Sequence, residues 1–381
     1  MATQVHDEPL SDLPSIPLPM SAEPPSNPTV KARKKLIRRA DRDHSQIMRR
    51  SFQRVFLLLN VWIGGIFYFW VRQFEPGGMA TSWQRPAGVE GWLPIAGLMN
   101  LRYLALTHHV PALHPAGMFL LIAFLAMSFL FRKAFCSWLC PVGTISEYLW
   151  RAGQKVFRRN FFLPRWLDIP LRGLKYLLLG FFVWAVTSMA ADALAAFMSS
   201  PYGVIADVKM LNFFRHLGQA GAITLFVLAV ASLLIQNFWC RYLCPYGALL
   251  GITSLFSPAR IRRNVETCID CAKCAKACPS ALPVDRLVTI QSAECTGCLE
   301  CVAACPAKDT LSLSLPKIPV LTPRPAKLPA WAIAAGIAVL FFGIVGFAKT
   351  AGYWDSHVPR ATYQQLVPDT DQTAHPMPGE N

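Results

Sequence analysis

The chain has 381 residues, of which 53% are hydrophobic and only 15% are charged, and its formal net charge is +15. Soluble proteins contain about a quarter charged residues, so this composition excludes an ordinary soluble two-domain enzyme. The 12 cysteines are too few, in a chain of this length, for a small secreted disulfide scaffold. The basic residues lie between long apolar blocks, which indicates membrane boundaries rather than a nucleic-acid partner.

Residues 1–54 are predicted to form a disordered, basic N-terminal tail in the cytoplasm. The first 30 residues are rich in proline and poor in large apolar side chains, so they bury too little surface to offset the entropy of ordering. A run of Lys and Arg then leads into the first apolar block.

Five apolar blocks are long enough to cross a bilayer as helices. They are residues 55–71, 114–131, 171–191, 222–239 and 328–347. A sixth block, residues 92–106, is shorter and carries Asn100 and Arg102, so we expect an interfacial or re-entrant helix there. We therefore predict an α-helical integral membrane protein with about five transmembrane helices.

The distribution of basic residues predicts the orientation. Of the 37 Lys and Arg residues, 30 fall within residues 31–54, 132–175 and 241–327, which are alternate connections. Basic loops face the cytoplasm, so we predict a multi-pass protein of the cell inner membrane with a periplasmic C-terminal tail. Every cysteine then lies on the reducing side, as metal-binding thiolates require.

The strongest motif is a C-x2-C-x2-C-x3-C-P run that occurs twice, at residues 268–279 and 295–306. Two such runs are typical of a bacterial two-cluster ferredoxin, in which the fourth cysteine of each run binds the other cluster. Zinc ribbons instead use two C-x2-C pairs, and this disfavours zinc. The predicted ligands are Cys268, Cys271, Cys274 and Cys305 for one 4Fe–4S cluster, and Cys295, Cys298, Cys301 and Cys278 for the other.

A second repeat, Cys-x3-Cys-Pro, occurs at residues 135–143 and 239–247 and contributes Cys136, Cys140, Cys240 and Cys244. Cysteines at i and i+4 share one face of a helix, and the following proline and glycine are expected to break that helix. If the two copies are neighbours, the four thiols could bind one metal ion or form a redox-active set. The alternative is that they are small buried residues at two duplicated helix ends.

These segments resemble the membrane-bound polyferredoxin family, which includes NapH-type and NosR-type proteins of anaerobic respiration and CcoG-type proteins of oxidase assembly. The resemblance covers residues 55–315 and implies electron transfer between the membrane quinone or quinol pool and a redox partner. Similarity to the CcoG type implies instead copper reduction at the Cys-x3-Cys-Pro thiols. The chain departs from NosR-type proteins in lacking a flavin-attachment sequence, and from CcoG-type proteins in lacking a long β-rich domain after the last span.

The expected fold is thus a helical membrane protein with a small inserted α+β ferredoxin domain. Its parts are the tail (1–54), a four-helix membrane domain (55–260), the two-cluster ferredoxin domain (261–316), the fifth transmembrane helix (317–350) and the periplasmic tail (351–381). Whether the chain is itself an enzyme or a subunit of an oxidoreductase is left open.

A quinol would also need a proton acceptor. Histidine titrates near neutrality, and carboxylates are further candidates, although ordinary polar loop residues are the alternative. The candidates are His108, His109, His114, Asp192 and Asp207.

Overall fold

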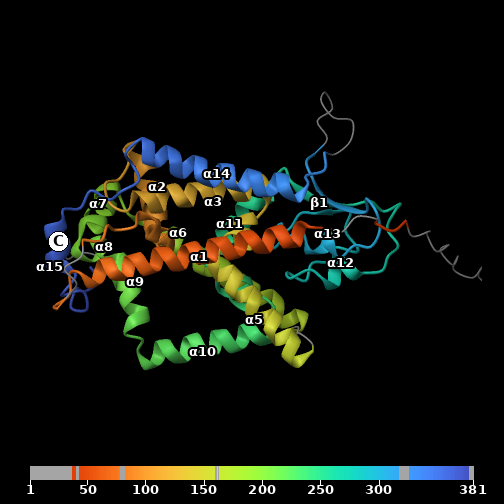
Figure 1. Ribbon diagram of the computed structural model, residues 1–381, viewed down its shortest axis with the longest axis horizontal. Helices are drawn as coiled ribbons and strands as arrows, with labels where there is room; N and C mark the ends of the chain where they lie inside the picture. Colours follow the sequence, from red (N-terminus) through yellow and green to blue (C-terminus); the bar gives the residue numbers. More distant parts are fainter. Residues whose placement is uncertain are drawn as a thin grey trace, which may run out of the picture. The chain divides into compact units, whose positions relative to one another are not determined.

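The computed structural model describes residues 37–39, 43–77, 82–158, 161, 163–316 and 326–376. The chain divides into two units, and the first, Met1–Lys35, lies outside the described residues. Most of the predicted tail, part of the predicted segment 317–350 and the last five residues therefore remain untested. The second unit, Leu36–Asn381, is mostly helical, with one small sheet (Figure 1).

The membrane part contains long helices and shorter helices that connect them. They are α1 (Ser45–Arg72), α2 (Pro94–Thr107), α3 (Pro115–Phe131), α4 (Ala134–Trp138), α5 (Pro141–Phe157), α6 (Arg165–Ser188), α7 (Ala191–Ser199), α8 (Pro201–Val204), α9 (Ala206–Arg215), α10 (Gln219–Leu234), α11 (Pro245–Leu255), α14 (Ala330–Thr350) and α15 (Arg360–Leu366). A 3-10 turn, η1 (Ala87–Trp92), precedes α2, and a π turn, η2 (Trp239–Leu243), precedes α11.

Three to four elements of the described chain could cross a membrane. Helix α1, residues Trp166–Ser188 of α6, and α14 are each long and apolar enough, while α9 and α10 qualify only together, across a bend of 80°. Helix α3 is apolar but has 17 residues. The protein is therefore a membrane protein, whereas the count of five spans stays a prediction.

Helix α1 begins at Ser45, so the prediction that the disordered tail extends to residue 54 was wrong by ten residues. Tertiary contacts order this polar start. Ser45, Arg49 and Gln53 are buried, and the Gln46 side-chain amide donates a hydrogen bond to the Cys298 carbonyl at 2.9 Å. Packing of this kind outweighs local composition.

Helix α3 lies at the centre of the bundle, in contact with α2, α11 and α14 (Figure 1). The predicted sixth block forms α2, where the buried Asn100 amide donates to the carbonyls of Leu113 and His114. Helices α5 and α10 cross at Gly153, because a Cβ atom there would collide with the Leu233 carbonyl.

The small sheet and two short helices follow α11. Strands β1 (Arg260–Arg263), β2 (Thr289–Ile290) and β3 (Leu311–Ser314) are antiparallel in the order β2-β1-β3, with Ile261 opposite both Ile290 and Leu313. Helices α12 (Lys273–Lys276) and α13 (Glu300–Ala303) each lie inside one cysteine run. One buried core continues from α3 into this domain, so the two parts are packed together.

Candidate metal centres

The two cysteine runs of the small domain fold into loops of the same shape. In each run the residue before the second cysteine has a positive φ, 53° at Asp270 and 63° at Gly297, and so has the residue after it, 54° at Ala272 and 60° at Leu299. Left-handed backbone is uncommon for residues other than glycine. Its recurrence at matched positions indicates that both loops are shaped by the same requirement, as expected for backbone wrapped around a cluster.

Each predicted ligand set lines its own cavity. One cavity is lined by Cys268, Cys271, Cys274 and Cys305, and another by Cys278, Cys295, Cys298 and Cys301. The structure therefore brings the fourth cysteine of each run to the other run's cavity, as the crossed pattern requires. We refer to them as the first and the second ferredoxin sets.

The two sets differ in their surroundings. Cys271 of the first set is exposed, whereas the loop of the second set is held by the membrane helices. The Ser137 hydroxyl donates to the Thr296 carbonyl at 2.7 Å, and the Trp138 indole N–H donates to the Gly297 carbonyl at 3.3 Å. The second set therefore lies toward the membrane part and the first set reaches solvent.

The four remaining cysteines, here called the thiol quartet, line a third cavity together: Cys136, Cys140, Cys240 and Cys244. The prediction that each pair shares one helix was wrong. Helix α4 ends at Trp138 and η2 ends at Leu243, and the second cysteine of each pair is the N-cap of the following helix, α5 or α11. Proline is favoured at the first position of a helix, so the proline after the second cysteine of each pair begins a new helix there.

The two capping cysteines have matched partners. The Gly143 N–H donates to Cys140 Sγ at 3.4 Å, and the Gly247 N–H donates to Cys244 Sγ at 3.2 Å. Burial raises the pKa of the Cys140 thiol to about 11. A bound metal would take the place of the proton.

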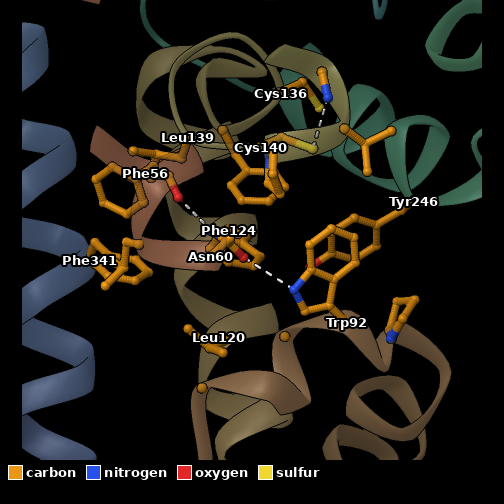
Figure 2. Close-up of a pocket in the computed structure, with 18 of the residues that line it drawn as sticks. Phe56, Asn60, Trp92, Leu120, Phe124, Cys136, Leu139, Cys140, Tyr246 and Phe341 are labelled. Carbon is orange, nitrogen blue, oxygen red and sulfur yellow. Dashed lines mark hydrogen bonds between the residues drawn. The ribbon is translucent and has the colours of Figure 1, made fainter. Parts of the chain in front are cut away.

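The quartet cavity has a volume of about 840 Å³ and extends well into the membrane part. Its lining includes Arg49 and Ile63 of α1, which are separated by about 21 Å along the helix. Cys298 of the second ferredoxin set also lines it, as do Arg85 and Lys349. Several aromatic side chains line the cavity, and Figure 2 shows Phe56, Phe124, Trp92 and Tyr246 in the same pocket as Cys136 and Cys140.

Buried charges surround the thiol quartet. The Lys133 side chain is 4% exposed and donates to the Ala293 carbonyl at 3.3 Å. Lys175 is fully buried and pairs with Glu294 at 2.6 Å. Burial alone would raise the pKa of Glu294, but the charges of Lys133 and Lys175 hold it below its usual value.

A second ion network joins α1, α5 and the ferredoxin domain. The buried Arg49 guanidinium pairs with Glu147 at 2.7 Å and with Glu300 at 2.8 Å. Burial alone would raise the pKa of Glu147, but hydrogen bonds from Arg49 lower it to about 2. Sequence analysis missed Arg49 because it lies in a polar run that resembled a tail.

The quinol-site candidates separate into two groups. His108, His109 and Asp192 are exposed, and none of the five candidates lines the quartet cavity. His114 and Asp207 are buried, and Arg85 brings them together, donating to Asp207 at 2.7 Å and lying 3.2 Å from His114 Nδ1.

Glu90 completes this outer network. It lies 2.7 Å from Arg85 and 3.4 Å from His114 Nδ1, while His114 Nε2 lies 2.8 Å from the Gly203 carbonyl. Arg85 and Glu90 were not predicted, because isolated charges in a loop carry no recognisable spacing.

Within the described residues, no three His, Cys, Asp or Glu side chains converge on a point that one metal ion could occupy. This holds for the thiol quartet and equally for the two ferredoxin sets. A cube of iron and sulfur spreads its four thiolates around itself, so cluster ligands do not meet at a single point.

Comparison with known proteins agrees with these sites. A family described as "4Fe-4S binding domain" matches residues 113–161 and 217–264, and one described as "4Fe-4S dicluster domain" matches residues 260–306. The first family matches twice, once around each Cys-x3-Cys-Pro motif, and the second covers the ferredoxin runs. Iron–sulfur binding domains therefore occupy both parts of the chain.

YccM of Escherichia coli strain K12 is 51% identical over 86% of this chain and 91% of its own length. Its name describes an electron transport protein and marks that role as provisional. The chain belongs to the membrane-bound polyferredoxin family. The resemblance noted from the motifs is thereby confirmed.

More distant members of the family match only part of this polyferredoxin. The ferredoxin-type protein NapH of Haemophilus influenzae is 25% identical over 58% of the chain and 77% of NapH. NirI of Paracoccus denitrificans is 32% identical over 46% of the chain but only 26% of NirI. No solved structure matches.

Proposed function

We propose that this polyferredoxin passes electrons between the membrane quinol pool and a redox partner through two 4Fe–4S clusters. One observation carries the proposal. A single cavity is lined by aromatic side chains of the membrane helices at one part and by Cys298 of the second ferredoxin set at another. A small molecule bound among the helices would therefore lie in a space that reaches the cluster ligands.

The two ferredoxin sets are the proposed cluster ligands, with the crossed assignment that their cavities support. Bound there, the clusters would supply one-electron transfer. The exposed Cys271 makes the first set the natural point of contact with a soluble or membrane-bound partner protein. The direction of flow in this proposal is from the membrane, through the second set, to the first.

The quinol would occupy the aromatic part of the cavity. Polar edges there can orient a ring, because the Trp92 indole N–H donates to the Asn60 side-chain oxygen at 3.1 Å and Tyr246 lies nearby (Figure 2). An apolar pocket with a few convergent polar groups is the usual form of a small-molecule site.

The proposed topology has five spans, α1, α3, α6, α10 and α14, with the ferredoxin domain and N-terminus cytoplasmic and the C-terminal tail periplasmic. Helix α3 has 17 residues, a rise of about 25 Å, and it is surrounded by other helices. The excess of basic residues in alternate loops supports this orientation in the inner membrane. A reporter fused after residue 381 should be active only if it is of the kind that folds in the periplasm.

Anaerobic mixing with a reduced quinol tests the function. The visible absorption of the clusters should bleach in the full-length protein, and Trp92→Phe should slow the bleaching several-fold. Trp62→Phe is the matched control, because Trp62 is 69% exposed on the same helix as Asn60. If dithionite reduces the clusters but no quinol does, the proposal fails.

A second candidate is a copper-reducing or oxidase-assembly factor. The observation that favours it is that four thiols line one cavity, since thiolates are preferred ligands of reduced copper. Replacing the four cysteines with serine should then abolish copper binding and leave the ferredoxin iron unchanged. Copper binding that survives this change would remove the candidate.

A further inference from the structure

The ferredoxin domain exposes apolar side chains beside the first ferredoxin set. Val265 is 45% exposed, Leu287 is 41% exposed and Val288 is 55% exposed. In the proposed topology this domain lies outside the bilayer, so lipid does not cover them. Apolar side chains that are grouped on a surface facing water mark a protein interaction site.

Arg263 connects this apolar group to the cluster ligands. Its backbone N–H donates to the Val288 carbonyl at 2.7 Å, and its side-chain Nε donates to the Leu287 carbonyl at 3.1 Å. Arg263 also lines the cavity of the first set and lies 3.5 Å from Asp270, the residue before the exposed Cys271. A protein seated on the apolar group would therefore lie close to the exposed ligand.

Exposed cations flank the apolar group. Lys273 and Lys276 lie on α12, on either side of the ligand Cys274, and Arg286 directly precedes Leu287. All three are exposed, and among the residues that the structure describes none of them lies within ion-pair distance of a carboxylate. We call the apolar side chains and the cations together the exit face: Val265, Leu287, Val288, Lys273, Lys276 and Arg286.

The nearby carboxylates do not cancel this positive charge. Asp270 is paired with Arg263, and Asp285 lines the cavity of the first set, which leaves the exposed Glu266 against three cations. The cations also offset the negative charge of a bound cluster, which would otherwise repel an acidic partner. A surface of this kind associates fastest with a partner that presents carboxylates, and salt screens the attraction.

We propose that the exit face docks a small soluble electron carrier whose redox centre is surrounded by carboxylates. One electron passes from the reduced first set to the oxidised centre of the carrier, and no covalent bond forms or breaks. The inference deepens the proposed function, because it rests on electron transfer through the ferredoxin sets. It does not depend on quinol as the donor.

Two haem proteins of opposite charge provide the test. The full-length protein is reduced with dithionite, freed of excess reductant and mixed with cytochrome b5, whose haem edge is surrounded by carboxylates, or with cytochrome c, whose haem edge is surrounded by lysines. The second-order rate of cytochrome b5 reduction should fall about tenfold or more from low to high salt. The rate with cytochrome c should not fall.

Charge reversal at the exit face localises the effect. Lys273→Glu combined with Lys276→Glu should lower the rate with cytochrome b5 about tenfold at low salt and should raise the rate with cytochrome c. The matched control is Lys155→Glu combined with Arg158→Glu, which makes the same change of charge at the exposed end of α5. Equal effects of the two double variants would show that net charge alone attracts the carrier, and would overturn the inference.

A variant that keeps every charge tests the apolar part. Leu287→Ser combined with Val288→Ser retains the backbone carbonyls that Arg263 binds, so the cluster absorption should be unchanged while the rate with cytochrome b5 falls several-fold. Val156→Ser combined with Phe157→Ser, at exposed positions of α5, is the control. An unaffected rate in the first variant overturns the inference.

The same measurements separate this inference from the proposed function. Electron transfer that occurs but responds equally to changes at the exit face and on α5 overturns the exit face alone. A reduced protein that passes no electron to either cytochrome contradicts both the exit face and electron transfer through the ferredoxin sets. A failure of quinol to reduce the protein removes the donor and leaves the exit face standing.

Discussion

The Ser137 hydroxyl and the Thr296 carbonyl are joined by a hydrogen bond of 2.7 Å, which connects the first Cys-x3-Cys-Pro motif to the second ferredoxin repeat. Each residue directly follows a cysteine, so the two backbones that carry candidate ligands touch. The hydrogen bond holds the ferredoxin domain against the membrane part at this point.

Arg49 is expected to be the main electrostatic contact between α1 and the ferredoxin domain. Arg49→Leu would leave Glu147 and Glu300 without their buried partner, and breaking a buried pair costs about 3–5 kcal/mol. The loss of visible cluster absorption on heating should therefore occur at a clearly lower temperature. Arg50→Leu is the control, because Arg50 is 46% exposed and lies 4.0 Å from Glu300; equal effects of the two changes would contradict the assignment.

The crossed ligand pattern predicts which cysteine changes act on the same cluster. Cys305→Ser should perturb the same paramagnetic signal as Cys274→Ser, because both side chains line the first cavity. Cys278→Ser should perturb the other signal, together with Cys298→Ser. An uncrossed arrangement would instead group Cys278 with Cys274.

Gly143 and Gly247, which follow the two Cys-Pro pairs, are expected to differ in how well they tolerate substitution by alanine. A Cβ atom at Gly143 would collide with the Cys136 carbonyl, whereas one at Gly247 would meet its nearest atom, Cys244 Sγ, at 3.5 Å, an ordinary contact. Gly143→Ala should cost about 1–3 kcal/mol and lower the iron content, and Gly247→Ala should do neither. Thermal unfolding and iron analysis of both variants check this, and equal stability and iron content in the two variants would contradict the expected difference.

Sequence spacing predicted the cysteine sets because ligands of one cluster must be close in space, and short loops leave few ways to achieve this. The spacing of Cys268, Cys271 and Cys274 therefore carries three-dimensional information by itself. Pro141 and Pro245 also carry local structural information, but the prediction of their effect was wrong. Each proline begins a new helix directly after the cysteine, whereas the prediction placed both cysteines of a pair in one helix that ends at the proline.

Long-range partners could not be predicted in this way. Arg49 and Glu300 are 251 residues apart, and nothing local distinguishes Arg49 from the exposed Arg50 beside it. In the sequence, Lys133 likewise cannot be distinguished from the other basic residues that follow a predicted span. Their roles come from burial, which depends on how the ferredoxin domain packs on the membrane helices.

The outer network predicts a specific pH dependence of stability. Burial alone would lower the pKa of His114, but the hydrogen bond to Glu90 and the charge of Glu90 raise this pKa above the usual 6.5. The charge of Asp207 also raises it, while the charge of Arg85 lowers it. Because the pKa of His114 is higher in the folded than in the unfolded protein, protonated His114 stabilises the folded state. This contribution is fully present below pH 6.5 and is lost as the pH rises through the folded-state pKa of His114. The pKa of Glu90 is lowered by its partners against the effect of burial, so its own contribution is lost only on acidification below about pH 4.5.

The unfolding temperature of the wild-type protein in detergent should therefore fall as the pH rises above 6.5, and His114→Gln should remove much of that slope. The groups that face His114 include Arg85, Glu90 and Asp207. His109→Gln is the control, since His109 is exposed at the end of α2. Because thiols and other groups titrate equally in both variants, an unchanged slope in His114→Gln would show that His114 is not the titrating group.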